Sequence, residues 1–368
     1  MKLPRVALFT FVLGFMVLLY LILDHLSFYL VPAAFGALLA MLMLPLNRKL
    51  ERWRCPRILA ITISLVIILA VFAVVGMLFT NQIISLTNDL PTIQNQLKEK
   101  FSDLHEFIAR QFGMSIENQT KFMNEESNAL VQSGGKWIGG ILLSTGALFA
   151  GVGLIIVHMF LFLLYRGRIK TFFLQVIPDE GQEKAETIIE QIAKVTQKYL
   201  TGVVTVMAIL SVLNSVGLLA LGIPNAIFFG ILAAILNVVP YVGVWIGSAL
   251  PIFMAIISKD SLIYPVAVVG VFIATQFIDN HFLTPRITGS QVRINALAAI
   301  GIIIVGGVVW GVGGMILFVP ILGMMKIVFD NISSLKPFGF LIGDDETYEE
   351  SRIVKTIRKI GGRKKPVK

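Results

Sequence analysis

Residues 237–251 read NVVPYVGVWIGSALP, and this stretch decides how the C-terminal part of the chain folds. Its Asn, Pro and Gly residues are types that favour turns and broken helices. Apolar runs flank it on both sides, AIFFGILAAIL before and IFMAII after, and no charged residue interrupts them. A turn inside such a segment requires a structural explanation, because unpaired backbone groups are costly in an apolar environment.

The composition places the chain in a membrane. It has 368 residues, of which 56% are hydrophobic and 14% charged, with a mean hydropathy of +0.83. A soluble domain has about 25% charged residues, and several runs here approach the ~20 apolar residues that cross a bilayer as a helix. The ~10-residue alternating segments of an outer-membrane barrel are absent. We therefore expect an all-α, polytopic integral membrane protein.

Several functional classes are excluded. Cys55 is the single cysteine and the four histidines are scattered, so no metal site is expected. The net charge of +9 comes from basic residues beside the apolar runs, which indicates membrane topology rather than nucleic-acid binding. There is no GxxxxGK[ST] motif and no arrangement of catalytic residues. We predict no enzyme activity and no cofactor.

Six full spans are expected, at residues 6–23, 27–46, 58–80, 137–165, 199–221 and 264–281. The link NRKLERWRCPR holds five basic residues and one acid, and YRGRIK after the fourth span is also basic. Cytoplasmic loops carry such an excess of Lys and Arg, so both links and the two termini are placed in the cytoplasm.

Two polar segments interrupt the spans. In residues 81–136, apolar residues recur every three or four positions after a helix start predicted at Asn88–Pro91, which indicates an external amphipathic helix. Residues 178–198 carry a similar stripe and lead into the fifth span on the cytoplasmic side. The predicted organisation is 1–80 (three spans), 81–136 (external insert), 137–177 (fourth span and exit), 178–198 (cytoplasmic helix), 199–330 (transport region) and 331–368 (basic cytoplasmic tail).

The opening stretch is explained by a re-entrant hairpin. Residues 225–257 would form a helix about 50 Å long, against a hydrocarbon core of about 30 Å. Split at the turn, each arm is too short to cross. A hairpin that enters and leaves on one side solves this, provided its turn lies in protein or along a wet cavity.

Residues 296–329 repeat the pattern, with clustered glycines at the centre and Pro320 after them. Two hairpins also place the loop FLTPRITGSQVRINA, with Arg286 and Arg293, in the cytoplasm. Eight plain spans are the alternative and would place that loop outside.

Asp279 is the exceptional acid within the apolar regions, and such residues are usually functional. Gln276 lies one turn before it, and Asn280 follows it. Asp279 either binds a proton or cation, or lies near the membrane edge, paired with Arg286 or capping a chain end. His158 is either a proton relay or a residue in an interhelical hydrogen bond, and the second interpretation also applies to Asn214.

PYVGVWIGSALP (240–251), QFIDNHFLTPRITGSQV (276–292) and GGVVWGVGGMILFVPILGMMKI (306–327) resemble the motifs of the autoinducer-2 exporter family, or PerM-like permeases, of bacterial inner membranes. The order of spans is also similar, so the resemblance covers nearly the whole chain. The residues and the resemblance together give these candidates for a substrate or ion site: Asn237, Pro240, Gly243, Gly247, Gln276, Asp279, Asn280, Pro285, Arg286, Gly289, Gly313, Gly314 and Pro320.

The resemblance implies a secondary transporter and a homo-oligomer in the bacterial inner membrane. Its solute would be a small polar molecule, a signalling molecule among them, or a monovalent cation, with coupling to a proton or sodium gradient. Membrane lipids are the other expected partner. A passive channel and a non-transporting scaffold are the alternatives. A scaffold needs neither turns at mid-membrane depth nor an intramembrane acid, and a channel needs no coupling ion.

Overall fold

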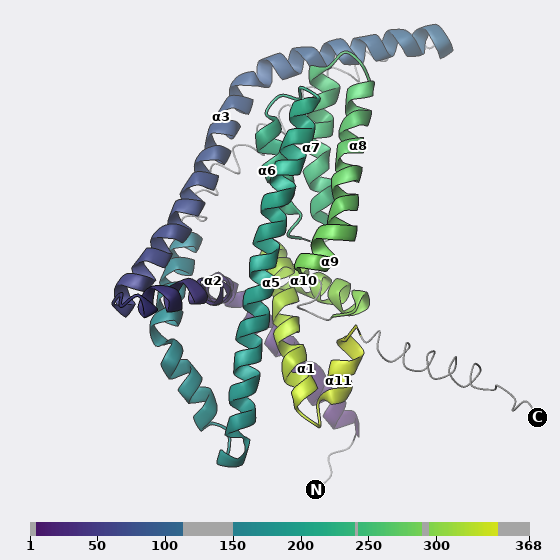
Figure 1. The fold of residues 1–368 in the computed structure, drawn as a ribbon. Coiled ribbons are helices and arrows are strands. Elements are labelled where there is room, and N and C mark those ends of the chain that lie inside the picture. Colours follow the sequence, from purple (N-terminus) through teal and green to yellow (C-terminus); the bar gives the residue numbers. More distant parts are fainter. Residues whose placement is uncertain (1–4, 113–149, 240–241, 289–293, 345–368) are drawn as a thin grey trace, which may run out of the picture. The chain divides into compact units, whose positions relative to one another are not determined.

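The computed structural model describes residues 5–112, 150–239, 242–288 and 294–344, and within them nearly every residue is helical (Figure 1). The single β feature of these ranges is an isolated bridge between Ile294 and Gly343. The helical elements are α1 (Arg5–His25), α2 (Ser27–Arg52), α3 (Arg57–Phe112), an unlabelled helix (Ala150–Gln175), α5 (Asp179–Ala220), α6 (Ala226–Leu236), α7 (Val242–Ser258), α8 (Ile263–Ile278), the π-helix η1 (Asp279–Leu283), α9 (Thr284–Ile287), α10 (Ala296–Asn331) and α11 (Lys336–Ile342).

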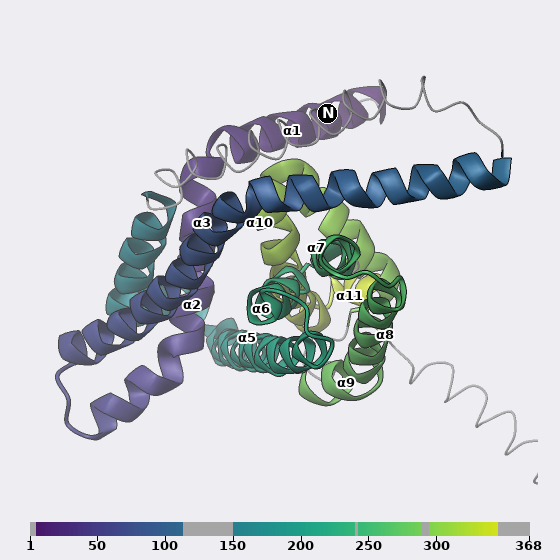
Figure 2. The same ribbon diagram turned by 90° about the horizontal axis from the view of Figure 1, so that it is seen from above.

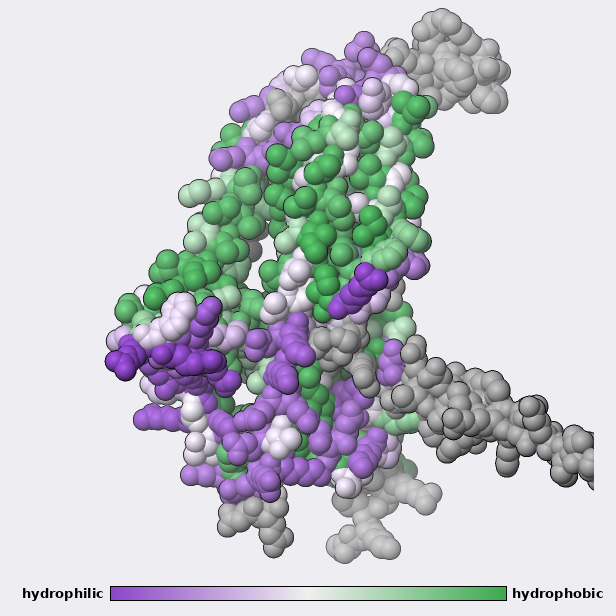
Figure 3. Space-filling model, viewed as in Figure 1, coloured by the Kyte–Doolittle hydropathy of each residue, from purple (hydrophilic) through white to green (hydrophobic). Residues whose placement is uncertain are grey.

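The all-α membrane architecture is confirmed. Six of the described helices are long and apolar enough to cross a bilayer. Many large apolar side chains are exposed: Trp245 is 80% accessible and Leu297 82%. In Figure 3 the visible faces of α6, α7 and α8 are green, whereas the link between α2 and α3 is purple. These surfaces match hydrocarbon and water, respectively, so the protein is a polytopic membrane protein.

The chain forms two compact units. The first unit comprises Met1–Leu42, Tyr165–Thr201 and Arg286–Lys368, and the second comprises Met43–Leu164 and Gly202–Pro285. Each therefore combines segments that are far apart in the sequence. The boundaries at Leu42 and Thr201 fall inside α2 and α5.

In the second unit, α6 and α7 form the first expected helical hairpin. They pack along each other, and α7 also packs against α8 (Figures 1 and 2). A methyl group at Gly247 would lie 2.8 Å from the Cα atom of Ala233, so glycine permits this close approach. Phe229 on α6, Ala255 on α7 and Val268 on α8 belong to the same buried cluster, which holds the three helices together.

In the first unit, α10 contains the second expected hairpin. Trp310 and Gly311 have non-helical backbone angles, and Gly311 has a φ of +59°, which favours glycine. Two residues eight apart in a straight helix would be separated by about 12 Å. Instead, a methyl group on Gly306 would overlap the backbone of Gly314, so the chain folds back on itself here. The Trp310 indole N–H donates to the carbonyl oxygen of Leu23 at the end of α1, at 2.9 Å.

The prediction of a new helix beginning at Asn88 is wrong. The third span and the predicted amphipathic helix form one helix, α3, of 56 residues, which is bent in Figure 1. Pro91 lies inside it, where it removes one backbone hydrogen bond and favours a bend without ending the helix. Likewise, residues 178–198 and the fifth span form the single helix α5. Residues 113–149 of the external insert and fourth span lie outside the described residues.

Candidate functional site

The first hairpin ends in a polar residue at its tip. Asn237 caps the C-terminus of α6, and its backbone N–H donates to the carbonyl oxygens of Ala233 and Ile235. Gly243 at the start of α7 donates its N–H to the Val239 carbonyl oxygen at 3.0 Å. A methyl group on Gly243 would overlap the Leu236 carbonyl group, so only glycine lets α7 begin this close to the end of α6.

Asp279 lies beside this tip, where α8 changes to a π-helix. Its side chain is 4% exposed. One carboxylate oxygen accepts a hydrogen bond from the Asn237 side-chain amide at 3.1 Å, and the other accepts one from the Thr284 hydroxyl at 2.7 Å. The backbone N–H of Thr284 also donates to the Asp279 carbonyl oxygen, in the i→i+5 pattern of the π-helix. Single π-turns of this kind are frequent at functional sites.

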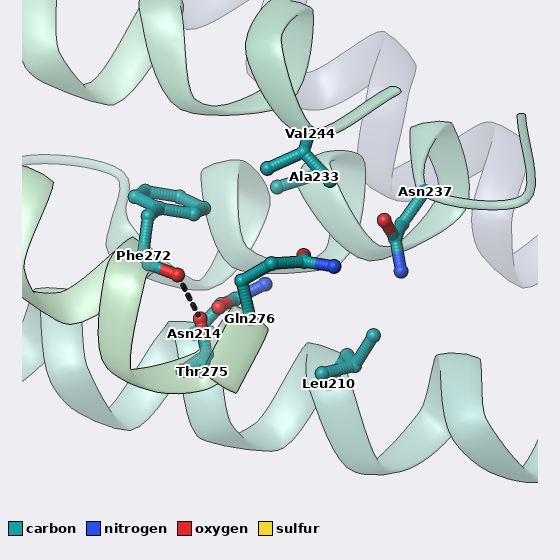
Figure 4. A pocket seen from close by; sticks show the side chains of 8 residues that line it. All are labelled: Leu210, Asn214, Ala233, Asn237, Val244, Phe272, Thr275 and Gln276. Atoms are coloured by element: carbon teal, nitrogen blue, oxygen red, sulfur yellow. Dashed lines mark hydrogen bonds between the residues drawn. The ribbon is translucent and has the colours of Figure 1, made fainter. Parts of the chain in front are cut away.

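A small cavity lies next to Asn237 among α5, α6, α7 and α8, all within the second unit. It has room for about one water molecule. In Figure 4, Gln276 extends from α8 toward Asn237, and its amide donates to the Asn280 side chain at 3.0 Å. The lining residues are Leu210, Asn214, Ala233, Asn237, Val244, Phe272, Thr275 and Gln276.

Asn214 on α5 lines the cavity, although the sequence suggested for it only an interhelical hydrogen bond. It is 4% exposed and lines the cavity, and its Oδ1 atom has no hydrogen-bond partner among the described residues. The expected interhelical hydrogen bond of Asn214 is therefore not found among the described residues. The sequence does contain one indication of this role: Asn214 is a lone carboxamide in an apolar span, and polar residues inside a membrane are usually functional.

The structure brings together three of the predicted site residues directly, Asn237, Gln276 and Asp279, and adds Asn280 through its bond to Gln276. Gly243 and Gly247 lie at the contact between α6 and α7, where they allow close packing. Pro285 and Arg286 are exposed on α9.

Gly313, Gly314 and Pro320 belong to the first unit. Gly314 forms the close crossing with Gly306 on the second hairpin. Gly313 faces Val31 and Phe35 of α2, and Pro320 is buried inside α10. Pro240 and Gly289 lie outside the described residues.

Two further buried polar residues, His158 and Asn47, form hydrogen bonds. His158 is 7% exposed, and its Nδ1 atom hydrogen-bonds the carbonyl oxygen of Leu154 in the same helix at 2.7 Å. Asn47 on α2, which the sequence analysis did not single out, donates to the hydroxyl of Ser64 on α3 at 2.7 Å. Asn47 and Ser64 are both fully buried, so the hydrogen bond between them joins α2 to α3 within the second unit. The described residues contain no group of three His, Cys, Asp or Glu suited to a metal ion.

Helices with exposed apolar faces surround a buried carboxylate and a polar cavity at the tip of a helical hairpin, an arrangement typical of membrane transport proteins. The comparison with known families is in agreement, because the sequence model of the AI-2E family transporter matches residues 8–334. The chain belongs to the AI-2E transport family, which consists of transporters and not of enzymes.

The chain is similar in sequence to bacterial proteins over most of its length. YueF of Bacillus subtilis (strain 168) is 25% identical over 317 residues, which are 83% of this chain and 84% of YueF. The AI-2 transport protein TqsA of Escherichia coli (strain K12) is 22% identical over 317 residues, 85% of this chain and 89% of TqsA. The similarity therefore extends over most of the length of this chain and of both relatives.

Proposed function

We propose that the protein is a secondary transporter of the bacterial inner membrane that moves a small polar solute or a monovalent cation, coupled to a proton or sodium gradient. The observation that carries this proposal is the buried Asp279 carboxylate beside the polar cavity at the hairpin tip. An Asp at the centre of a membrane helix costs about 2.5–3.5 kcal/mol on insertion scales. A transporter needs such a group, since movement of an ion requires a polar site that is closed to lipid.

Autoinducer-2 is one solute to test, because the relative TqsA is named as an AI-2 transport protein. The shared length supports the comparison, but solute choice depends on the residues of the site. In this chain the cavity walls are apolar side chains and neutral polar groups, and no lining residue is charged. Beside the buried Asp279 carboxylate, and with room for about one water molecule, this cavity favours a small cation over an anion.

The first hairpin provides a possible moving part. Its two arms, α6 and α7, are each too short to cross a bilayer of about 30 Å at 1.5 Å per residue. A re-entrant hairpin and the π-turn at Asp279 close the site from one side, and a shift of the hairpin opens it. Alternating access of this kind occurs in transporters with discontinuous helices.

The proposed topology places both termini and the link between α2 and α3 in the cytoplasm. Exposed Arg48, Lys49, Arg52 and Arg54 in and beside that link support this orientation. Lipid chains contact the exposed apolar faces of the helices. We also propose that copies of the chain associate as a homo-oligomer, on the basis of the family resemblance.

Purified full-length protein in liposomes tests the function. The assay applies a proton or sodium gradient and measures uptake of autoinducer-2, of small polyols and of radioactive sodium. We expect gradient-driven flux of at least one of them, lost in Asp279→Asn at normal expression and solubility. Ser211→Ala is the control, because its hydroxyl donates to Met207 on its own helix and does not line the cavity.

The alternatives give different results in the same assay. Flux that follows the solute gradient alone, with no response to protons or sodium, would indicate a passive channel. Absence of flux for every solute in both gradients would support a non-transporting scaffold. Full gradient-driven flux in Asp279→Asn would remove the coupling role of this carboxylate.

A further inference from the structure

The side-chain oxygen of Asn214 has no hydrogen-bond partner among the described residues. Asn214 is buried, it lines the cavity, and its Oδ1 atom accepts no hydrogen bond from the described residues. A buried acceptor without a donor is unfavourable, and native proteins rarely retain one without a role. A partner for this oxygen, either a hydrogen-bond donor such as water or a cation, fits in the cavity.

The other polar groups around the cavity also offer oxygen atoms. Asn237 uses its amide N–H to bind Asp279, and Gln276 uses its amide N–H to bind Asn280. One N–H of each amide is used in these bonds, and neither amide oxygen accepts a hydrogen bond from the described residues; both side chains line the cavity (Figure 4). The Thr275 hydroxyl donates its hydrogen to the Phe272 carbonyl oxygen, so its lone pairs are free as well. The side-chain oxygens of Asn214, Asn237 and Gln276 therefore line the cavity without a donor among the described residues.

We propose that this cavity binds one dehydrated monovalent cation of the size of Na⁺, held by the side-chain oxygens of Asn214, Asn237, Thr275 and Gln276. Hard cations take oxygen ligands, and a site of neutral oxygens lacks the carboxylate ligands typical of Ca²⁺ sites. The space for about one water molecule admits an ion but no multi-carbon solute. The inference deepens the proposed function and rests on it, since it supplies the coupling ion.

Asp279 is then a positioning residue and not a ligand of the ion. Both of its carboxylate oxygens already accept hydrogen bonds, one from Asn237 and one from Thr284. A carboxylate can only accept from Asn237, and this fixes the Asn237 amide with its nitrogen toward Asp279 and its oxygen toward the cavity. An asparagine at position 279 can also donate, so the Asn237 amide is free to reverse and to turn its nitrogen toward the ion.

Thermal unfolding of the purified full chain in detergent tests the site without transport. Wild type is measured in sodium, lithium, potassium and choline chlorides at one ionic strength, and binding of radioactive sodium is measured in parallel. We expect sodium to raise the melting temperature above the choline value and potassium to have a smaller effect. A protein that binds a ligand only when folded is stabilised in this way.

Asn214→Leu retains the size of the side chain and removes its oxygen. We expect it to lose the sodium-dependent shift while its melting temperature in choline stays equal to or above wild type, because the orphan acceptor is gone. Asn214→Asp adds a charged oxygen and should lower the sodium concentration at the midpoint. Ser211→Ala, one turn earlier on α5, should behave as wild type.

Asp279→Asn should raise the sodium midpoint at least tenfold with little change of the melting temperature in choline, a result that a purely structural role would not give.

No shift with any alkali cation, an equal shift with potassium, or an undiminished shift in Asn214→Leu would each overturn the proposal. Sodium binding without gradient-driven flux would refute the proposed function and leave the site standing. Gradient-driven flux without sodium binding would refute the sodium site and leave the proposed function standing.

Discussion

Replacing Gly243 by alanine places a methyl group inside the turn of the first hairpin. The added carbon would lie 2.7 Å from the backbone nitrogen of Asn237 and would overlap the Leu236 carbonyl group. Carbon atoms pack best at about 3.5–4.0 Å, so the start of α7 would have to move by about 1 Å. These neighbours are backbone atoms and cannot rotate aside. Overpacking typically costs about 1–3 kcal/mol, and we expect a value near the upper end for Gly243→Ala.

A matched control separates this steric effect from helix propensity. Gly270 lies on α8 in the same unit, and a methyl group there meets nothing within 4 Å. Gly270→Ala should be neutral or more stable by up to about 1 kcal/mol, because alanine favours a helix more than glycine does. Thermal and denaturant unfolding in detergent measure both variants. Equal stability of the two proteins would refute the argument that the turn requires glycine at position 243.

The other predictions concern the second hairpin, the topology and two polar pairs. Gly314→Ala would collide with the backbone of Gly306 and should lower the melting temperature, whereas Gly301→Ala on the same helix meets nothing within 4 Å and should not. In a Cys55→Ser background, an impermeant thiol reagent on intact cells should label a cysteine at Ser261 and miss one at Ser290; the reverse pattern would support eight plain spans. The hydrogen bond and charge of Lys100 lower the pKa of Asp260, so this pair stabilises above the unfolded pKa and is lost as the pH falls through the folded value. Asp260→Asn should thus have a small effect that vanishes in high salt. Asn47→Ala removes the donor to Ser64 but also the Asn47 Oδ1 atom, which has no partner among the described residues, so it should cost only about 0.5–1.5 kcal/mol in unfolding free energy.

The two hairpins could be predicted from the sequence because the argument rests on length. Apolar arms of about 14 residues cannot cross a 30 Å core, and glycines and prolines mark the turns between them. The continuation of α3 through Asn88 and Pro91 could not be predicted in the same way. An Asn followed by a Pro favours a helix start when no helix precedes it. Here a helix already runs into these residues, and passing through the proline costs one hydrogen bond and a bend.

The composition of the site was only partly predictable, since a sequence relates residues along one helix but not across helices. The spacing of four joins Gln276 to Asn280 on one face of α8, and the structure places a hydrogen bond there. Nothing in the sequence aligns Asn214 on α5 with Asn237 at the end of α6, so the orphan acceptor could not be recognised. Likewise, the role of Gly243 depends on the Leu236 carbonyl group across the turn.

The hydrogen bonds of Asp279 bear on its two predicted roles, cation binding and pairing with Arg286. The sequence offered Arg286 as an ion-pair partner, which would balance the carboxylate charge within the protein. The observed donors, Asn237 and Thr284, are neutral, so they hydrogen-bond the carboxylate without supplying a positive charge. A negative charge in an apolar region attracts a cation more strongly than it would in water, because the dielectric constant is low. The adjacent cavity of neutral oxygens is where that cation can bind, and this is why Asn214→Leu, which leaves Asp279 and both of its donors in place, is the sharper test of the ion site.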